Sequence, residues 1–164
     1  MQPPQIKTLT PKKLIGKSLP MSVSKDLTFQ LWQSFMQNRK QITNAIGTDL
    51  YCLQVYSNSF DFKAFNPDAQ FEKWAAIEVA DFNSIPEGFS SIELETGLYA
   101  VFNYKGLPSA FGAMLNYIYS VWFPSSDYEL DARPHFQVMG AKYSNTSPES
   151  EEEIWVPIKH KLRV

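Results

Sequence analysis

The chain has 164 residues, 44% of them hydrophobic, which suits one domain with its own buried core and leaves little room for a second. Its 15 basic and 17 acidic side chains give a net charge of −2 without a long block of either sign, which argues against direct binding of nucleic acid. Cys52 is the single cysteine, and no stretch has the apolar length of a signal sequence or membrane span, so we expect a cytoplasmic protein without membrane contact.

The first half of the chain predicts a strand, a helix and two strands. Residues 10–22 contain enough apolar and β-branched side chains for a strand. Asp26 then offers an N-cap, and apolar residues follow at steps of three and four up to Gly47, a residue suited to the end of a helix. Alternating patterns over 51–57 and 73–81 predict the two strands, with a loop between them.

The second half repeats this order. Residues 92–106 predict strand, and residues 109–124 predict a helix that stops at Pro124. Residues 133–140 and 152–159 predict two further strands around a polar loop. The patterns therefore indicate an α+β fold made of a duplicated βαββ unit, with a pseudo-two-fold antiparallel sheet and both helices on one face.

We accordingly expect one domain over residues 1–164, with halves at about 6–82 and 90–160. Because the helices would cover one face of the sheet, the other face is the predicted place for a ligand groove. In strand 73–81, Ala75, Ile77 and Val79 suit the helix side, which leaves Trp74 and Glu78 on the other.

The strand "HFQVM" carries a neutral amide, Gln137, between two apolar neighbours. Phe136 and Val138 share one face of an extended chain, so Gln137 and Met139 look toward the opposite side, where there is either solvent or a binding cavity. The predicted groove lining consists of Tyr56, Trp74, Glu78, Tyr104, Gln137, Met139 and Trp155.

Each of these residues has a second interpretation. Glu78 can be a solvated residue on an open sheet face, and Gln137 an ordinary strand residue. Trp74 and Trp155 can close a second hydrophobic cluster. We expect no metal and no cofactor, because His135 and His160 have no Cys or Asp at ligand spacing and no phosphate-binding loop or Ser-His-Asp order occurs.

An ordered set of short segments runs through nearly the whole chain. The segments are "LIG", "LW..F", "AAIEV", "IPEGF", "GLYAVFNYKG", "YSVWFPSSDYEL", "RPHFQVM" and "EEIWVPIK". This set resembles the GyrI-like family, also called the AraC-type effector-binding domain, which senses drugs at the C-terminus of many bacterial transcription regulators. The resemblance implies a groove that binds bulky, often cationic and aromatic compounds between stacked rings and a buried carboxylate.

The family commonly has Phe-Glu-x-Tyr where this chain has Phe136, Gln137, Val138 and Met139. Gln137 thus occupies the position of the effector-binding acid without its charge, and Glu78 becomes the candidate acid. A family-like segment begins within the first 15 residues, so we expect a stand-alone form without its own DNA-binding domain.

The resemblance leaves three functions open. The first is a small-molecule effector-binding or multidrug-binding protein. The second is a hydrolase of strained electrophilic molecules that uses the same groove, with Glu78 as general acid or base and a tyrosine as hydrogen-bond donor. The third is an interaction module that inhibits a DNA-acting enzyme, which would require a protein partner or a homodimer.

Overall fold

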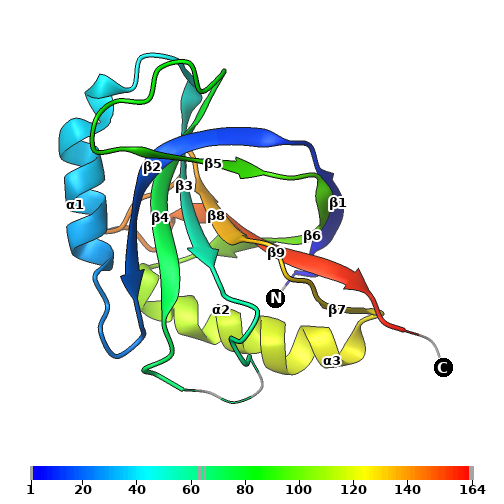
Figure 1. The fold of residues 1–164 in the computed structure, drawn as a ribbon. Helices are drawn as coiled ribbons and strands as arrows, with labels where there is room; N and C mark the ends of the chain where they lie inside the picture. Colours follow the sequence, from blue (N-terminus) through cyan, green and yellow to red (C-terminus); the bar gives the residue numbers. More distant parts are fainter. Residues whose placement is uncertain (1, 63, 65, 163–164) are drawn as a thin grey trace.

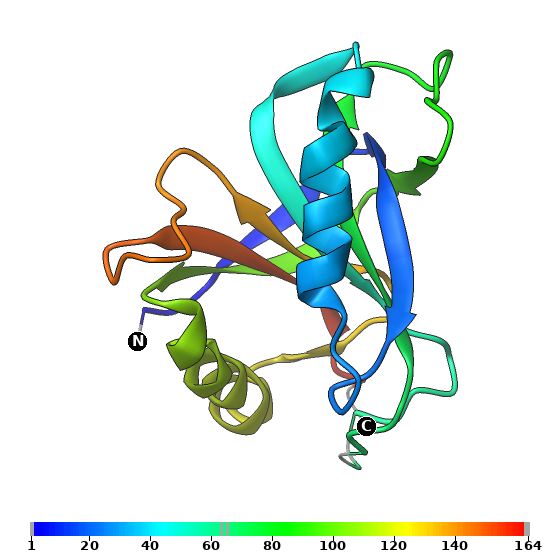
Figure 2. The same cartoon turned by 90° about the vertical axis from the view of Figure 1, so that its left-hand side faces the viewer.

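A computed structural model describes residues 2–62, 64 and 66–162 of the chain. One antiparallel sheet curls around its own core, and the helices lie on its outer face (Figures 1 and 2). The strands are β1 (Gln5–Leu9), β2 (Lys12–Met21), β3 (Ala45–Val55), β4 (Phe71–Val79), β5 (Ser90–Leu94), β6 (Gly97–Lys105), β7 (Tyr128–Leu130), β8 (His135–Met139) and β9 (Glu151–His160). The helices are α1 (Thr28–Asn38), α2 (Phe111–Tyr117) and α3 (Phe123–Ser125), with shorter helical turns at η1 (Arg39–Gln41), η2 (Pro108–Ala110) and η3 (Ile118–Trp122).

The strands follow the order β1-β6-β9-β8-β3-β4-β2-β5, and β7 pairs with β9. The pair β3–β8 lies at the centre of this order. On one side of it come β4 and β2, and on the other β9 and β6, so that β2-α1-β3-β4 and β6-α2-β8-β9 occupy equivalent places. The predicted α+β fold with an antiparallel sheet is confirmed. The single strand predicted over 92–106 is instead two strands, β5 beside β2 and β6 beside β9, and β1 and β7 are strands that the patterns did not indicate.

The first helix is shorter than its pattern indicates. α1 ends at Asn38, and one further turn of η1 brings Ile42 into the core below the helix. Gly47, expected just after the helix, lies within β3 with φ of 77°. There the pairing between β3 and β4 shifts register between Ala45 and Leu50. The predicted end of the helix is therefore wrong, because the apolar spacing continues across a turn into a strand.

The second helix is confirmed over its predicted length, but it is built from three segments. α2, η3 and α3 follow one another without a break, and η3 is a wider π-helical turn. Met114 and Ile118 are buried against β6 and β9, where they contact a cluster that includes Phe102 and Ile154. This packing places the α2–η3 segment along one side of the sheet's outer face (Figure 2).

Both faces of the sheet are buried because the sheet curls. Leu31 and Phe35 of α1 pack on Ile15 and Ile77 on the outer face. The inner face holds a separate core, whose members include Leu14, Leu53, Trp74, Tyr99 and Phe136.

No described helix is both long and apolar enough to cross a membrane.

Candidate functional site

A cavity of about 710 Å³ lies over the outer face of the sheet. Its floor comes from β3, β4, β8 and β9, one wall comes from α2 and η3, and the loop between β3 and β4 covers one end. Residues that line it include Gln54, Tyr56, Asp61, Phe62, Lys73, Leu115, Tyr119, His135, Gln137 and Ile154. The size is sufficient for a drug-sized molecule.

The cavity is on the side of the helices, not on the opposite face as the alternation suggested. Cys52 lies opposite Ala75 on β4 and opposite Gln137 on β8, and Gln137 lies opposite Ile154 on β9. Ala75 packs under α1, so this whole row faces the helices. The expected groove face is instead filled by the core inside the curl.

Aromatic rings gather at the end of the cavity below the β3–β4 loop. Tyr56 lies 4.6 Å from Phe60 and 4.7 Å from Phe62, measured between ring centroids. Phe62 is nearly parallel to His135, with 5.4 Å between ring centroids and an interplanar angle of 12°, and nearly parallel to Tyr119, with 6.4 Å between ring centroids. Such a set of ring faces and edges favours a flat or aromatic ligand.

His135 is the polar member of this aromatic group and is only 5% exposed. Its Nδ1 lies 3.2 Å from the hydroxyl of Tyr119. Burial lowers the pKa of His135 to about 3, so the imidazole is neutral at pH 7 and can accept a hydrogen bond from Tyr119. Burial also raises the pKa of Tyr56 to about 12 and keeps Tyr119 protonated.

Two amides form the middle of the cavity floor. Gln54 Nε2 donates to Gln137 Oε1 at 2.9 Å, and Gln137 Nε2 donates to Gln54 Oε1 at 3.1 Å. Lys73 lies directly opposite Gln54 on β4, and its Nζ donates to Thr28 Oγ1 at 2.8 Å. The floor therefore presents amide donors and acceptors beside one cationic group.

Glu152 is an acid that the sequence analysis did not single out. It lies on β9 two residues before Ile154, on the same face, and opposite Tyr104 of β6, and it is not among the residues that line the cavity. Burial raises the pKa of Glu152 to about 7. Among the residues that the structure describes, none donates a hydrogen bond to this carboxylate or forms an ion pair with it. Its place on the helix side was detectable, because Glu152 shares the two-residue period of Ile154 and Val156.

Three of the seven predicted groove residues border the cavity: Tyr56, Gln137 and Trp155. The ring of Trp155, however, stacks on Phe136 at 5.2 Å, inside the curl. The expectation that Trp155 and Gln137 share one face of the sheet is therefore wrong. Trp74 is 6% exposed in the same inner core.

The remaining predicted residues lie away from the cavity. Glu78 is on the inner side of β4, opposite Leu14, and its carboxylate pairs with Lys12 at 3.4 Å. Tyr104 is buried on the outer face, where its hydroxyl donates to the carbonyl of Leu107. Met139 follows Gln137 at the end of β8 and is not among the residues that line the cavity.

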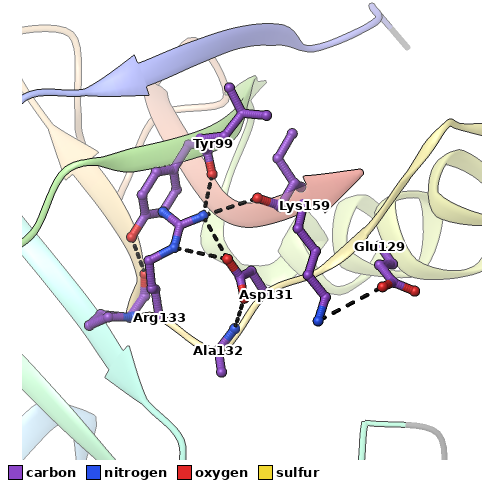
Figure 3. Close-up of polar contacts among 9 residues, drawn as sticks. Tyr99, Glu129, Asp131, Ala132, Arg133 and Lys159 are labelled. Carbon is purple, nitrogen blue, oxygen red and sulfur yellow. Dashed lines mark hydrogen bonds and ion pairs between the residues drawn. The ribbon is translucent and has the colours of Figure 1, made fainter. Parts of the chain in front are cut away.

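A smaller cavity of about 270 Å³ lies behind the aromatic group, bordered by Asp131, Arg133 and Lys159. Figure 3 shows the polar contacts of these three residues. Arg133 Nη2 donates to the carbonyl oxygens of Leu98 at 2.7 Å and Ile158 at 3.0 Å, and the guanidinium pairs with Asp131. Lys159 lies 3.8 Å from Glu129. These charges hold β6, β9 and the segment before β8 together, so we assign them a structural role.

Within the described ranges, no group of three or more His, Cys, Asp and Glu residues is arranged to hold a metal ion. Cys52 is 8% exposed on the outer face, and burial raises the pKa of its thiol. A buried, protonated thiol is a poor nucleophile and a poor metal ligand. The groups that line the larger cavity can stack on rings, form hydrogen bonds and pair with charges.

Comparisons with known proteins agree with this geometry. A family model described as a GyrI-like small molecule binding domain matches residues 2–159. The transcriptional regulator BrlR of Pseudomonas aeruginosa is 23% identical over 146 residues, which cover 88% of this chain but only 51% of BrlR. The chain thus spans about half the length of this relative.

Solved structures share the fold at low sequence identity. The structure of SAV2435 bound to tetraphenylphosphonium superposes with a TM-score of 0.76 and 17% identity, covering 96% of this chain and 94% of that one. A hydrolase encoded by lin2189 from Listeria innocua superposes with a TM-score of 0.57 and 12% identity, covering 96% and 92% of the two chains.

Proposed function

The chain belongs to the GyrI-like family of small-molecule-binding domains, and from this premise we propose that it binds a bulky aromatic ligand in the cavity over β3, β4, β8 and β9. The observation that carries the proposal is the aromatic group at one end of the cavity, in which the ring of Phe62 is nearly parallel to those of His135 and Tyr119. Ring stacking would supply most of the affinity, and the amides of Gln54 and Gln137 would orient the ligand.

The proposal has support from a structural neighbour. SAV2435, which has the same fold, was solved with tetraphenylphosphonium, a bulky ligand made of four phenyl rings. The positive charge of that ligand is not carried over to this chain, because the residues that line the cavity include the neutral amide of Gln137, the cationic Lys73 and the acidic Asp61.

Hydrolysis of an electrophile in the same cavity is a second candidate. The observation that favours it is the buried pair of His135 and Tyr119 at the cavity wall, whose Nδ1 and hydroxyl lie 3.2 Å apart and form a hydrogen bond along which a proton can move. Glu78, the expected catalytic acid, is paired with Lys12 on the other face. If this cavity hydrolyses electrophiles, wild type should convert an aromatic epoxide into its diol, and His135→Phe should lose this activity.

The binding proposal can be tested by filling the cavity from an exposed position. Ser120 lines the cavity on η3 and is exposed, whereas Ala113 is exposed on the same helical segment and does not line it. We expect Ser120→Trp to abolish saturable binding of xanthene dyes, measured by fluorescence anisotropy, and Ala113→Trp to bind like wild type. Equal binding by both variants would place the ligand elsewhere.

A further inference from the structure

A straight row of three residues crosses the cavity floor. Lys73 of β4 lies opposite Gln54 of β3, and Gln54 lies opposite His135 of β8. Residues directly opposite each other in adjacent strands point to the same face of a sheet, and all three line the cavity. Two inter-strand spacings of about 4.8 Å put the backbones of Lys73 and His135 roughly 10 Å apart. The row therefore brings a cation, an amide and an aromatic group within the length of one drug-sized molecule.

Lys73 is the charged group of the cavity floor. Among the described strand residues that line the cavity, it is the only lysine, arginine or acid. Gln137, in the middle of the floor, is a neutral amide joined to Gln54 by two hydrogen bonds. These strand residues thus offer a ligand one positive charge and no carboxylate.

Lys73 keeps hydrogen-bonding capacity for a ligand. It is half-buried, and its Nζ donates to Thr28 Oγ1 at 2.8 Å. The Thr28 hydroxyl in turn donates to Asp26 Oδ1 at 2.5 Å, so the contact of Lys73 with this acid is indirect. In the part of the chain that the structure describes, no carboxylate forms an ion pair with Lys73. An ammonium has three N–H donors, so two remain for an anionic group in the cavity.

Asp61 also lines the cavity with a charge. It lies on the loop between β3 and β4 and is exposed, whereas Lys73 is half-buried on the floor. Water and salt screen an exposed charge more strongly than a half-buried one. Lys73 should therefore act on the charge of a bound ligand more strongly than Asp61 does.

We infer that the ligand of this cavity is an aromatic anion, whose rings lie beside His135 and Phe62 and whose carboxylate or sulfonate pairs with Lys73. This inference rests on the proposed binding function and adds the charge of the ligand. A cationic ligand would meet Lys73 as a like charge, and a neutral one would leave the two N–H donors without an anionic acceptor.

Two fluorescent probes with one ring frame test the inference at pH 7. 1-Anilinonaphthalene-8-sulfonate carries a sulfonate, and N-phenyl-1-naphthylamine is the same frame without it. We expect Lys73→Gln to weaken binding of the sulfonate about 10-fold and to change binding of the neutral probe less than about 2-fold, because glutamine keeps a donor for Thr28 but has no charge. Lys73→Arg keeps the positive charge and should bind the sulfonate within about 3-fold of wild type.

Lys17→Gln is the matched control. Lys17 is half-buried on the same outer face of the sheet, opposite Ala75, with its Nζ 5.0 Å from the centre of the Phe89 ring, and it does not line the cavity. This variant changes the net charge as Lys73→Gln does, but it should bind both probes like wild type. Asp61→Asn removes the exposed acid and should tighten binding of the sulfonate by no more than about 3-fold.

The outcomes separate this inference from the proposed function. If Ser120→Trp abolishes binding of both probes but Lys73→Gln weakens the sulfonate no more than Lys17→Gln does, the anion inference is overturned and the binding function stands. Binding of rhodamine 6G, a cation, that is tighter than binding of the sulfonate and is lost in Asp61→Asn would also overturn the inference. If neither probe binds saturably to wild type, or Ser120→Trp leaves binding intact, the proposed site itself falls.

Discussion

Gln54 and Gln137 are joined by two reciprocal amide hydrogen bonds of 2.9 and 3.1 Å, although 83 positions separate them in the chain. Each amide uses one donor and one acceptor in this pair. Gln54 Nε2 also donates to Cys52 Sγ at 3.6 Å, so the donor that is left for a ligand is on Gln137. The pair therefore fixes the orientation of both side chains on the cavity floor, and it explains what a neutral amide does in the middle of β8.

The coupling between these amides should be measurable. We expect Gln54→Leu or Gln137→Leu alone to lower the free energy of unfolding by about 1 to 2 kcal/mol, because each leaves its partner with unmade hydrogen bonds. The double variant should lose less than the sum of the two, giving a coupling energy of about 1 kcal/mol in a urea-denaturation cycle. Strictly additive losses would show that the two amides do not interact in solution.

Restoring an acid at position 137 should favour cations. Gln137→Glu adds a carboxylate to the cavity lining, worth about 1.5 to 3 kcal/mol with a cationic group, but it costs about 1 kcal/mol where two oxygens meet in place of the amide pair. We expect affinity for rhodamine 6G to rise roughly 2- to 30-fold at pH 8, and less at pH 5.5. Fluorescence titration at both pH values measures this, with Gln137→Met as the uncharged control.

Glu152 should destabilise the free protein at alkaline pH. Its folded pKa of about 7 is raised above the ordinary 4.5, so the folded state resists ionisation, and stability is lost as pH rises from about 4.5 through 7. Because the side chain is partly exposed, we expect Glu152→Gln to raise the free energy of unfolding by only about 1 to 2 kcal/mol at pH 8, and by almost nothing at pH 4.5. Urea denaturation of wild type, Glu152→Gln and the control Glu95→Gln provides the comparison.

His135 has the opposite dependence on pH. Its folded pKa of about 3 is lowered from 6.5, so the unfolded chain gains a proton that the folded chain does not, and stability falls as pH drops below 6.5. His135→Phe keeps the stacking on Phe62 but loses the acceptor for Tyr119, and should be about 1 kcal/mol less stable at pH 7. By pH 5 the variant should have gained about 2 kcal/mol relative to wild type. A difference that stays constant with pH would contradict a buried neutral histidine.

Gly97 should tolerate no side chain. A Cβ at this position would lie 2.1 Å from Nη1 of Arg133 and would displace the guanidinium that donates to Leu98 and Ile158. We expect Gly97→Ala to lower the free energy of unfolding by about 1 to 3 kcal/mol. Gly112→Ala is the matched control, since nothing lies within 4 Å of a Cβ there, and on α2 it should be neutral or slightly stabilising.

The sequence allowed the prediction of the α+β fold and of most strands, because alternation and helical spacing are local signals. It also separated the two faces of β4 correctly, with Ala75 and Ile77 toward α1 and Glu78 away. It could not show which face held the cavity. In a curled sheet both faces are apolar, so the alternation on β8 does not say whether Phe136 or Gln137 faces the helices.

The residues around the candidate cavity were only partly predictable from local patterns. Tyr56 and Gln137 were found because a ring and an amide stood out in strand patterns. Glu152 and Lys73 were not singled out, because a charged residue at the start of a predicted strand is usually exposed. The link between Gln54 and Gln137 needs the register of β3 against β8, which no local pattern contains.

The central position of β3 and β8 has a consequence for folding. The floor of the cavity does not exist until two segments far apart in the sequence have met, and closing so long a loop is slow compared with forming α1 or the β3–β4 pair. A compound that contacts both Gln54 and Gln137 therefore binds only to chains in which β3 and β8 have already paired. Such a compound stabilises the completed fold by mass action and offers nothing to either half alone.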